Sequence, residues 1–382
     1  MYSYSESVFD IRQLITLLYR GGYTRLVLFG AGGWGKALCK EICKYGIKIP
    51  IVFADNDPTK TNTELMGKLV ISPDHANPAG DIVAITTISA GDRVSSQLEA
   101  LGFERGKNYL EVMKNTDVNY PFEVCNFYKR HLVGFNGANV LHVGPGGHLG
   151  VELLIHAMGA RSVSSVEYNS FGLLYPDVTD HYEFYQGLSV EMKKRLKADP
   201  FRLAPSMTDL FENGALLREN EKLFINTEII KLWFPYSLTR LPFDSNFFDI
   251  VLHHAVLEHV SNPQKGYEEI YRVLKPGGKT VGLVDPQDHR TFSSKRLYHP
   301  LKFLEYSQDQ WQDIAGRINY HNRATMPEHR HMIARTGFKI EQWQDLMTMD
   351  ISDRIWSRFH SRFRQFSKKD IGVLRFSFSA VK

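Results

Sequence analysis

The chain has 382 residues, of which 43% are hydrophobic and 23% charged, and its formal net charge is +4. This length allows two domains with separate cores, and the composition is that of a globular protein. No apolar run approaches the roughly 18 residues of a membrane span, and a mild positive charge without a basic patch argues against nucleic acid as a partner. Because no basic segment followed by an apolar core opens the chain, we expect no secretory signal and a cytoplasmic protein.

The three cysteines, Cys39, Cys43 and Cys125, are too few for a disulfide framework and do not have the spacing of a zinc site. Cys39 and Cys43 fall four residues apart in an expected helix, so we interpret them as buried thiols. Neither an HExxH motif nor a cysteine cluster supports the histidines as metal ligands, and we expect no metal.

The first third of the chain alternates short apolar runs with segments of helical spacing. The expected strands are residues 25–30, 49–57, 81–89 and 108–112, and the expected helices are residues 35–46 and 90–103. This alternation predicts a parallel sheet with helices on both faces. A polar, proline-containing stretch without periodicity follows and is typical of a linker. We therefore predict a first domain over residues 1–115, a linker over 116–121 and a second domain over 122–382.

A glycine-rich turn, LFGAGGWGK, follows the first expected strand, and its glycines are Gly30, Gly32, Gly33 and Gly35. Asp55 ends the next strand, where dinucleotide-binding folds place the acid that holds a ribose. A domain of only about 110 residues is short for two mononucleotide halves and a substrate domain. It more closely resembles the small nucleotide-sugar-binding domain at the front of some sugar acyltransferases. We interpret its loop as an accessory nucleotide site.

A second cycle of strand, glycine turn and helix begins after a helical segment at residues 122–135. Its turn, LHVGPGGHLG, contains Gly144, Pro145, Gly146, Gly147 and Gly150. Glycines at this point let a ligand approach the backbone, and the helix N-terminus offers N–H groups to an anion. Glu167 ends the following strand, where a carboxylate can accept both hydroxyls of an adenosine ribose.

The rest of the chain continues as an α/β pattern. Residues 171–233 are long for a connection and hold helical patches, which is typical of a functional cover or extra helices. A buried strand at 248–254, a helix at 263–278 stopped by Pro276 and Gly277, and strands at 279–286, 337–340 and 374–382 follow.

The stretch LPFDSNFFDIVLHHAVLEHVSNPQKGYEEIYRVLKPGGKTVG, downstream of the second glycine turn, resembles class I S-adenosylmethionine-dependent methyltransferases. The resemblance covers about residues 122–382 and implies an α/β chain of two Rossmann-like parallel-sheet domains in tandem, the second a class I methyltransferase fold with helical insertions. It implies S-adenosyl-L-methionine as the cofactor, with the glycine turn at its methionine part and Glu167 at its ribose. The further cofactor contacts that it implies are His142, Tyr168, Ser237 and His253.

Two of these positions depart from the pattern of many relatives. His142 stands where relatives carry an acid two residues before the first glycine, and Ser237 stands near the place of an acid that contacts the adenine. Both departures bear on cofactor affinity. His253 and His254 are adjacent in the strand and therefore point to opposite faces, so at most one is expected to enter the methyl-transfer cleft.

A hydroxyl acceptor requires a base that takes its proton. Asp288 and His289 follow the strand at residues 279–286, at the edge where open α/β sheets place reactive groups. We predict His289, with Asp288 beside it, as the base, and His254 as a further catalytic candidate. Glu258 and His259 are interpreted as stabilising the start of the next helix.

The segments DHR, FLEYS and YHNR together resemble methyltransferases of bacterial surface-polysaccharide gene clusters. This looser resemblance suggests a sugar acceptor, as a nucleotide sugar or at the end of a glycan. It places Tyr320, His321 and Arg323 at the acceptor.

Residues 354–369 carry Arg354, Arg358 and Arg362 four apart among aromatic residues. If helical, the segment would be amphipathic, with a basic stripe for phosphates or a lipid surface, although a solvated face over an aromatic core is the commoner arrangement. Peripheral membrane contact and oligomer formation stay open. Two alternatives to the enzyme also stay open: a methyltransferase fold that has lost catalysis and serves as a binding or scaffold subunit, and a bifunctional enzyme whose first domain binds NAD(P).

Overall fold

A computed structural model describes residues 12–43, 46–86, 91–112, 118–132, 134–168, 174–198, 209–293, 299–315 and 321–382. The chain divides into two compact units. The first comprises Met1–Thr116, Asp288–Lys302 and Gln308–Asn319, and the second comprises Asp117–Gln287, Phe303–Ser307 and Tyr320–Lys382. Relative to the predicted span 122–382, two later segments thus group with the first unit. Of the described helices, none has the length and apolar character needed to cross a bilayer.

The first unit is built on a six-stranded sheet in the order β3-β4-β2-β1-β5-β6, in which only β3 is antiparallel to its neighbour. Its strands are β1 (Arg25–Phe29), β2 (Ile51–Ala54), β3 (Glu64–Leu65), β4 (Lys68–Ile71), β5 (Asp81–Ile85) and β6 (Tyr109–Glu111). Its helices are α1 (Arg12–Arg20), α2 (Gly33–Cys43), α3 (Gly91–Ala100), α8 (Arg290–Ser293) and α9 (Gln308–Ala315), with a 3₁₀ turn η2 (Pro73–His75).

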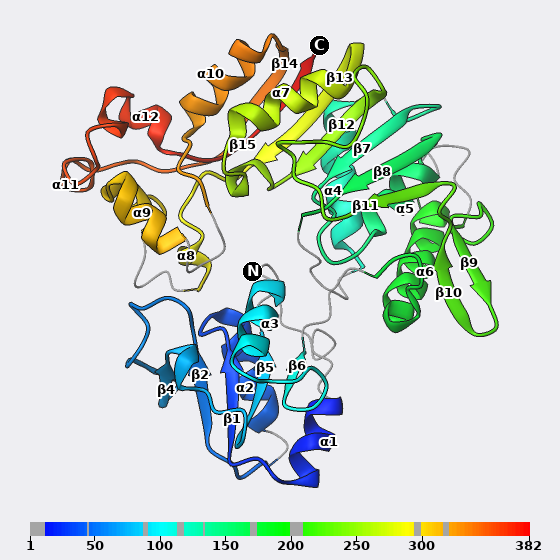
Figure 1. Cartoon of the computed structure of the whole chain (residues 1–382). Coiled ribbons are helices and arrows are strands. Elements are labelled where there is room, and N and C mark those ends of the chain that lie inside the picture. Colours follow the sequence, from blue (N-terminus) through cyan, green and yellow to red (C-terminus); the bar gives the residue numbers. More distant parts are fainter. Residues whose placement is uncertain are drawn as a thin grey trace. The chain divides into compact units, whose positions relative to one another are not determined.

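The sheet of the first unit is covered on both faces, as the sequence predicts. Residues of α1 and α2 pack with one face of β1 and β5, and residues of α3 pack with the other (Figure 1). The pattern places apolar residues on both faces of the central strands, which is typical of a parallel sheet between two helical layers. Cys39 is buried as expected, whereas Cys43 is exposed because it is the last residue of α2.

The described residues of the second unit form a seven-stranded sheet and a two-stranded hairpin of β9 and β10. The strands are β7 (Asn139–Val143), β8 (Ser162–Val166), β9 (Leu216–Glu219), β10 (Lys222–Ile225), β11 (Ile230–Trp233), β12 (Phe248–His254), β13 (Leu274–Val284), β14 (Lys339–Thr348) and β15 (Val373–Val381). The helices are α4 (Tyr120–His131), α5 (Gly150–Ala157), α6 (Tyr182–Ala198), α7 (Pro263–Val273), α10 (Met326–Thr336), α11 (Asp353–Trp356) and α12 (Lys368–Ile371), and the 3₁₀ turns are η3 (Thr179–His181), η4 (Leu257–His259), η5 (Lys302–Glu305, continuing from the first unit) and η6 (Phe363–Gln365).

The sheet order is β11-β8-β7-β12-β13-β15-β14, and β15 runs antiparallel to both of its neighbours while the other strands are parallel. Helices α4 and α5 pack with one face, through Ile250 and Leu252 of β12. Helices α7 and α10 pack with the opposite face, through Val251 (Figure 1). This is an α/β fold of the class I methyltransferase type, and β7 and β12 lie at its centre.

The structure differs from the predicted elements at two places in this unit. Helix α7 ends at Val273 and β13 already begins at Leu274, so Pro276 and Gly277 lie in the strand and not at the end of the helix. Proline disfavours helix at the preceding residue, and the register between β12 and β13 shifts here to absorb the extra residues. Residues 354–369 fall in three short pieces, α11, η6 and α12, and not in one helix, and Phe359 and Phe363 of this segment are buried.

The long excursion before β12 holds α6 and the hairpin of β9 and β10, and it ends in β11, an edge strand of the main sheet. The sequence pattern predicts helical patches there but gives no signal for β11. Four residues with a lysine and a tryptophan are too short and too polar to separate from a loop by periodicity.

Candidate cofactor site

The second glycine loop joins β7 to α5 at the carboxyl edge of the sheet. Gly144 and Gly146 have φ angles of 76° and 74°, which favour glycine. A Cβ on Gly144 would lie 2.5 Å from Cγ2 of Val256, so this turn also packs too closely for any side chain. On Gly150 a Cβ would lie 2.8 Å from Cγ of Pro121, which brings the start of α4 against the start of α5.

Glu167 follows β8, the neighbour of β7, and its carboxylate reaches back to this loop. The Gly146 N–H donates to Oε2 at 3.2 Å and the Tyr168 N–H donates to Oε1 at 2.7 Å. Two carboxylate oxygens oriented by backbone donors beside a glycine turn are the hydrogen-bond acceptors that the hydroxyls of an adenosine ribose need. The ring of Tyr168 is 65% exposed at the same edge. These residues therefore fit S-adenosyl-L-methionine.

His142 lies below the loop and not in it. Its Nδ1 is 2.5 Å from Oε1 of Glu152, its Nε2 is 3.1 Å from the hydroxyl of Tyr128, and its side chain is buried. Because β7 directs this side chain into the core, both ring nitrogens already have interior partners. The predicted direct contact between His142 and the cofactor stays a prediction, and in this structure its ring contacts Tyr128 and Glu152.

Glu152 is the partner that the sequence analysis missed. It is fully buried on α5, and Ser165 of β8 donates to its Oε1 at 2.7 Å. Burial raises the pKa of this carboxyl, but His142 and the hydrogen bonds from His142 and Ser165 outweigh burial, so the pKa is lowered overall. An acid is thus present behind the loop, although it comes from the helix and not from the strand. Only its place on the apolar face of α5 could have signalled this role.

The two histidines at the end of β12 point to opposite faces, as predicted. His253 is fully buried against Phe378, and burial together with neighbouring histidines lowers its pKa to about 3. A Cβ on Gly282 would lie 1.9 Å from Cε1 of His253, so the ring fills the space above that glycine. His253 is a core residue here, and its predicted cofactor contact is not supported.

His254 faces the α4 side and lies edge-on to the rings of Tyr120 and Phe127, with centroid distances of 6.3 Å and 5.5 Å. Burial lowers its pKa to about 4, so the imidazole is neutral at pH 7. It is half-buried at the end of the strand. Of the pair, His254 is the histidine at the edge where the glycine loop lies.

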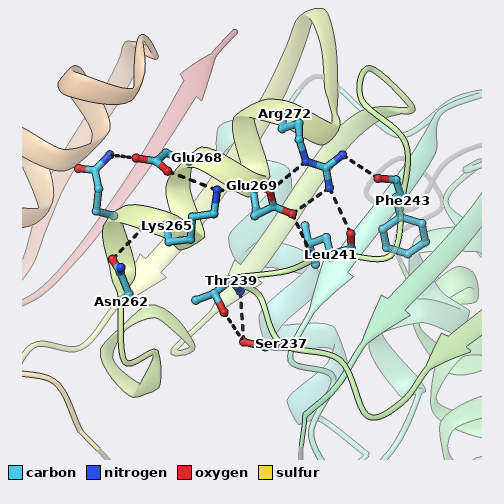
Figure 2. A network of polar contacts seen from close by, with 10 residues as sticks. Ser237, Thr239, Leu241, Phe243, Asn262, Lys265, Glu268, Glu269 and Arg272 are labelled. Carbon is cyan, nitrogen blue, oxygen red and sulfur yellow. Dashed lines mark hydrogen bonds and ion pairs between the residues drawn. The ribbon is translucent and has the colours of Figure 1, made fainter.

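Ser237 belongs to a turn that α7 holds in place (Figure 2). Its Oγ accepts the Thr239 N–H at 3.2 Å and lies 2.9 Å from the Thr239 hydroxyl, so the side chain closes its own turn. Glu269 accepts the Leu241 N–H at 2.9 Å, and Arg272 donates to the carbonyl of Phe243 at 2.7 Å (Figure 2). Glu269 and Arg272 of α7 therefore anchor the LPF segment that follows this turn.

The predicted base pair lies apart from this set. Asp288 groups with the first unit, and its carboxylate accepts from the guanidinium of Arg290 at 2.9 Å and 2.6 Å. This ion pair, and not His289, takes up the Asp288 side chain. The role of His289 as the base, with Asp288 beside it, stays a prediction.

The predicted acceptor contacts have interior partners. Nδ1 of His321 contacts the Asn322 carbonyl, its Nε2 lies 3.4 Å from the Asp285 carbonyl, and burial lowers its pKa to about 3. Arg323 donates to the carbonyls of Phe303 and Tyr306 and is 5% exposed. Tyr320 lies outside the described residues. His321 and Arg323 thus tie the segment before α10 into the unit.

The accessory loop of the first unit is closed by the acid that was expected to hold a ribose. The Ala31 N–H and Nζ of Lys60 donate to Oδ2 of Asp55 at 2.9 Å and 2.8 Å, and the Asp57 N–H donates to Oδ1. A Cβ on Gly35 would lie 2.1 Å from the Gly30 carbonyl oxygen, so helix α2 packs tightly on the loop. Gly32 lies in the same turn, and Gly33 begins α2. Its role as a nucleotide site stays a prediction.

The basic residues of 354–369 are divided among internal ion pairs. Arg358 pairs with Glu305 at 2.8 Å, and Arg362 pairs with Glu328 at 2.8 Å. Because the segment is not one helix, these side chains do not form the predicted stripe.

Residues 218–282 match the family model described as a methyltransferase domain. The matched segment runs from β9 into β13 and includes the LPF segment, β12 and α7. The match supports a class I methyltransferase in the second unit, with S-adenosyl-L-methionine as its cofactor. The glycine loop and Glu167 precede the matched segment, so their assignment rests on the geometry described above.

Several curated proteins are similar to parts of this chain. A demethylmenaquinone methyltransferase from Renibacterium salmoninarum is 32% identical over 119 residues, which is 31% of this chain and 45% of that protein. One from Clavibacter sepedonicus is 51% identical over 43 residues, 11% of this chain and 18% of that protein. An uncharacterised protein from Methanocaldococcus jannaschii is 34% identical over 89 residues, 22% of this chain and 39% of that protein. The chain spans less than half the length of each of these relatives.

Solved methyltransferase structures also align with this chain. One from Mesorhizobium loti is 12% identical, covers 69% of this chain and 98% of its own, and gives a TM-score of 0.37. One from Methanosarcina mazei is 17% identical, covers 67% of this chain and 96% of its own, and gives a TM-score of 0.34. The strand order of the second unit, and not these scores, carries the fold assignment.

Proposed function

We propose that this chain transfers a methyl group from S-adenosyl-L-methionine to a sugar hydroxyl, on a nucleotide sugar or on a surface glycan, in the cytoplasm. The observation that carries the proposal is the paired arrangement of the Gly144–Gly150 loop and Glu167 at the carboxyl edge of β7 and β8. The bound cofactor would supply a methyl group on a sulfonium. The protein has to hold the acceptor in line, exclude water and take up one proton.

The sugar acceptor rests on the sequence resemblance of the DHR, FLEYS and YHNR segments. A second candidate is C-methylation of a quinone precursor, which the names of two relatives favour: both are demethylmenaquinone methyltransferases. Both acceptors require a group that takes up a proton, because O-methylation of a hydroxyl and C-methylation of an aromatic ring each release one.

The test is an incubation of the full chain with methyl-labelled S-adenosyl-L-methionine and three acceptor sets: nucleotide sugars, glycan extracts and demethylmenaquinone. Label in a carbohydrate is the expected result. Label in demethylmenaquinone alone would replace the sugar by the quinone acceptor. If calorimetry shows no binding of the cofactor, the hypothesis of an active methyltransferase is wrong and the hypothesis of a scaffold subunit is favoured.

A further inference from the structure

The carboxyl group of Glu258 is a buried acid at the edge of the sheet that carries the cofactor loop. Glu258 lies in η4, which begins three residues after β12 ends, and its side chain is fully buried. Its Oε1 accepts the Asp285 N–H at 3.2 Å, whereas its Oε2 has no hydrogen-bond partner in the part of the chain that the structure describes. A buried carboxyl oxygen without a partner is costly, so such groups are rare unless they serve a function.

The arginine whose charge acts on Glu258 is paired with another acid. Arg375 of β15 donates from Nε and Nη2 to Oδ2 of Asp285, at 3.1 Å and 2.6 Å, and Gln287 donates to Oδ1 of Asp285. Glu258 therefore faces the negative charge of Asp285 while Arg375 is already paired. Burial, followed by Asp285, raises the pKa of Glu258 to about 8, and Arg375 opposes this only in part.

The groups on the other side of Glu258 are neutral at pH 7. Burial, with the charge of Glu258 adding to it, raises the pKa of Tyr267 on α7 well above its usual value. The Tyr267 hydroxyl lies 3.0 Å from Nδ1 of His329 on α10, and burial lowers the pKa of that histidine to about 3. The pKa of His321, before α10, is lowered in the same way. None of these three groups offers Glu258 a cation, whereas a ring nitrogen of its chain neighbour His259 lies within 4.8 Å of a carboxylate oxygen of Glu258.

The backbone that carries Glu258 is held rigidly. The Asn322 N–H donates to the Glu258 carbonyl at 2.7 Å, and Nδ2 of Asn322 donates to the carbonyls of Leu257 and Val260 at 2.6 Å and 2.8 Å. Three bonds from one residue thus fix the turn from both sides. A fixed turn with an unsatisfied carboxyl oxygen is a preorganised acid–base group, not a mobile surface side chain.

We propose that Glu258 is the general base that takes the acceptor's proton in the methyl transfer, an inference that rests on the proposed function. A lone pair of the acceptor oxygen forms the new bond to the methyl carbon, and the electrons of the broken carbon–sulfur bond stay on sulfur, which becomes neutral. The acceptor's O–H proton passes to Oε2 of Glu258, and its bonding electrons stay on oxygen. The proton then leaves to water. A ring acceptor would lose a C–H proton to the same oxygen.

The base candidates that the sequence predicts suit the task less well. Asp288 is paired with Arg290, and its neighbour His289 was the base that the sequence predicts. Burial lowers the pKa of His254 to about 4, which makes it a weak base at pH 7. A base is most effective when its pKa lies near the working pH, and Glu258 meets that condition.

The experiment compares the full-length wild type with Glu258→Gln, which keeps the shape but cannot accept a proton, and with Glu341→Gln as a charge-matched control on exposed β14. The rate of methyl transfer by Glu258→Gln should fall by roughly 10²–10⁴-fold. The Kd for S-adenosyl-L-methionine, measured by calorimetry, should change by less than about threefold. The wild-type rate should rise to a plateau as the pH passes 8, and Glu341→Gln should behave as wild type. A Glu258→Gln rate within threefold of wild type, with the same pH profile, would overturn the proposal.

A second measurement does not depend on turnover. Infrared difference spectra between pH 6 and pH 10 should show a protonated carboxyl band that is lost with rising pH in the wild type and absent in Glu258→Gln. If the band is the same in both proteins, Glu258 is not the titrating acid and the proposal fails. If Glu258→Gln does not fold, Glu258→Asp replaces it: its displaced carboxyl should lower methyl transfer while cofactor binding is kept, and its infrared band should titrate at a different pH from the wild-type band. A wild type that binds the cofactor but methylates no acceptor refutes the proposed function first, and the role of Glu258 as a base falls with it.

Discussion

Replacing Glu167 by Gln is the sharpest test of the cofactor site. In the structure each carboxylate oxygen of Glu167 accepts one backbone N–H, from Gly146 and from Tyr168. A glutamine keeps one accepting oxygen and turns an NH₂ group toward the other donor. It also loses the charge that strengthens hydrogen bonds from ribose hydroxyls.

The magnitude follows from hydrogen bonds to charged groups, which contribute about 1.5–3 kcal/mol each. Loss of one such bond should therefore weaken S-adenosyl-L-methionine binding by about 10- to 150-fold, since about 1.4 kcal/mol corresponds to a factor of ten. Isothermal calorimetry on Glu167→Gln and on the exposed control Glu219→Gln measures this directly. A Kd for Glu167→Gln within twofold of the wild type would refute the assignment of this edge as the ribose site.

Three further predictions follow from buried polar groups. Burial lowers the pKa values of His253, His321 and His329 to about 3, so their contribution to stability is complete above pH 6.5 and is lost as the pH falls toward 3. Urea unfolding followed by tryptophan fluorescence should therefore show a lower midpoint at pH 5 than at pH 7.5. Equal midpoints would contradict this prediction. His329→Gln should flatten that pH dependence, which the same titration measures, and an unchanged slope would count against the histidine explanation. Arg272→Lys loses the hydrogen bonds to the carbonyls of Leu241 and Phe243 and should lower the unfolding free energy of the second unit by about 1–3 kcal/mol. The exposed control Arg335→Lys should unfold as the wild type does. Equal unfolding of both variants would show that the LPF segment does not need Arg272 as an anchor.

The sequence predicts the fold well where local signals agree. The glycine turns at Gly30 and Gly144 each follow an apolar run and precede a helix, and both appear in the structure between a strand and a helix. Alternation along β12 correctly separates His253 from His254 on the two faces. The edge strand β11 was missed because a short strand paired on one side carries little periodicity.

The site was predicted less completely, since its side chains come from distant segments. The residue type of His142 suggests a ligand contact, but the pleat of β7 sends the ring into the core, where Glu152 of α5 meets it. Asp288 was expected to orient His289, yet Arg290, two residues away, takes its carboxylate. Partners of this kind depend on rotamers and on packing, and neither is written in local spacing.

The sequence by itself determined the two-domain α/β architecture, the glycine loops, the acid at Glu167 and the methyltransferase resemblance, because backbone geometry and apolar periodicity are local properties. Only the tertiary structure decided which acids are paired and which are not. It ties Asp55 to Lys60 and Asp285 to Arg375, and it leaves one oxygen of Glu258 without a partner among the described residues. Burial and charge pairing are set by segments far apart in the chain. For this reason Glu258, which the sequence pattern indicates as a residue at the start of a helix, is proposed as the base only from the tertiary structure.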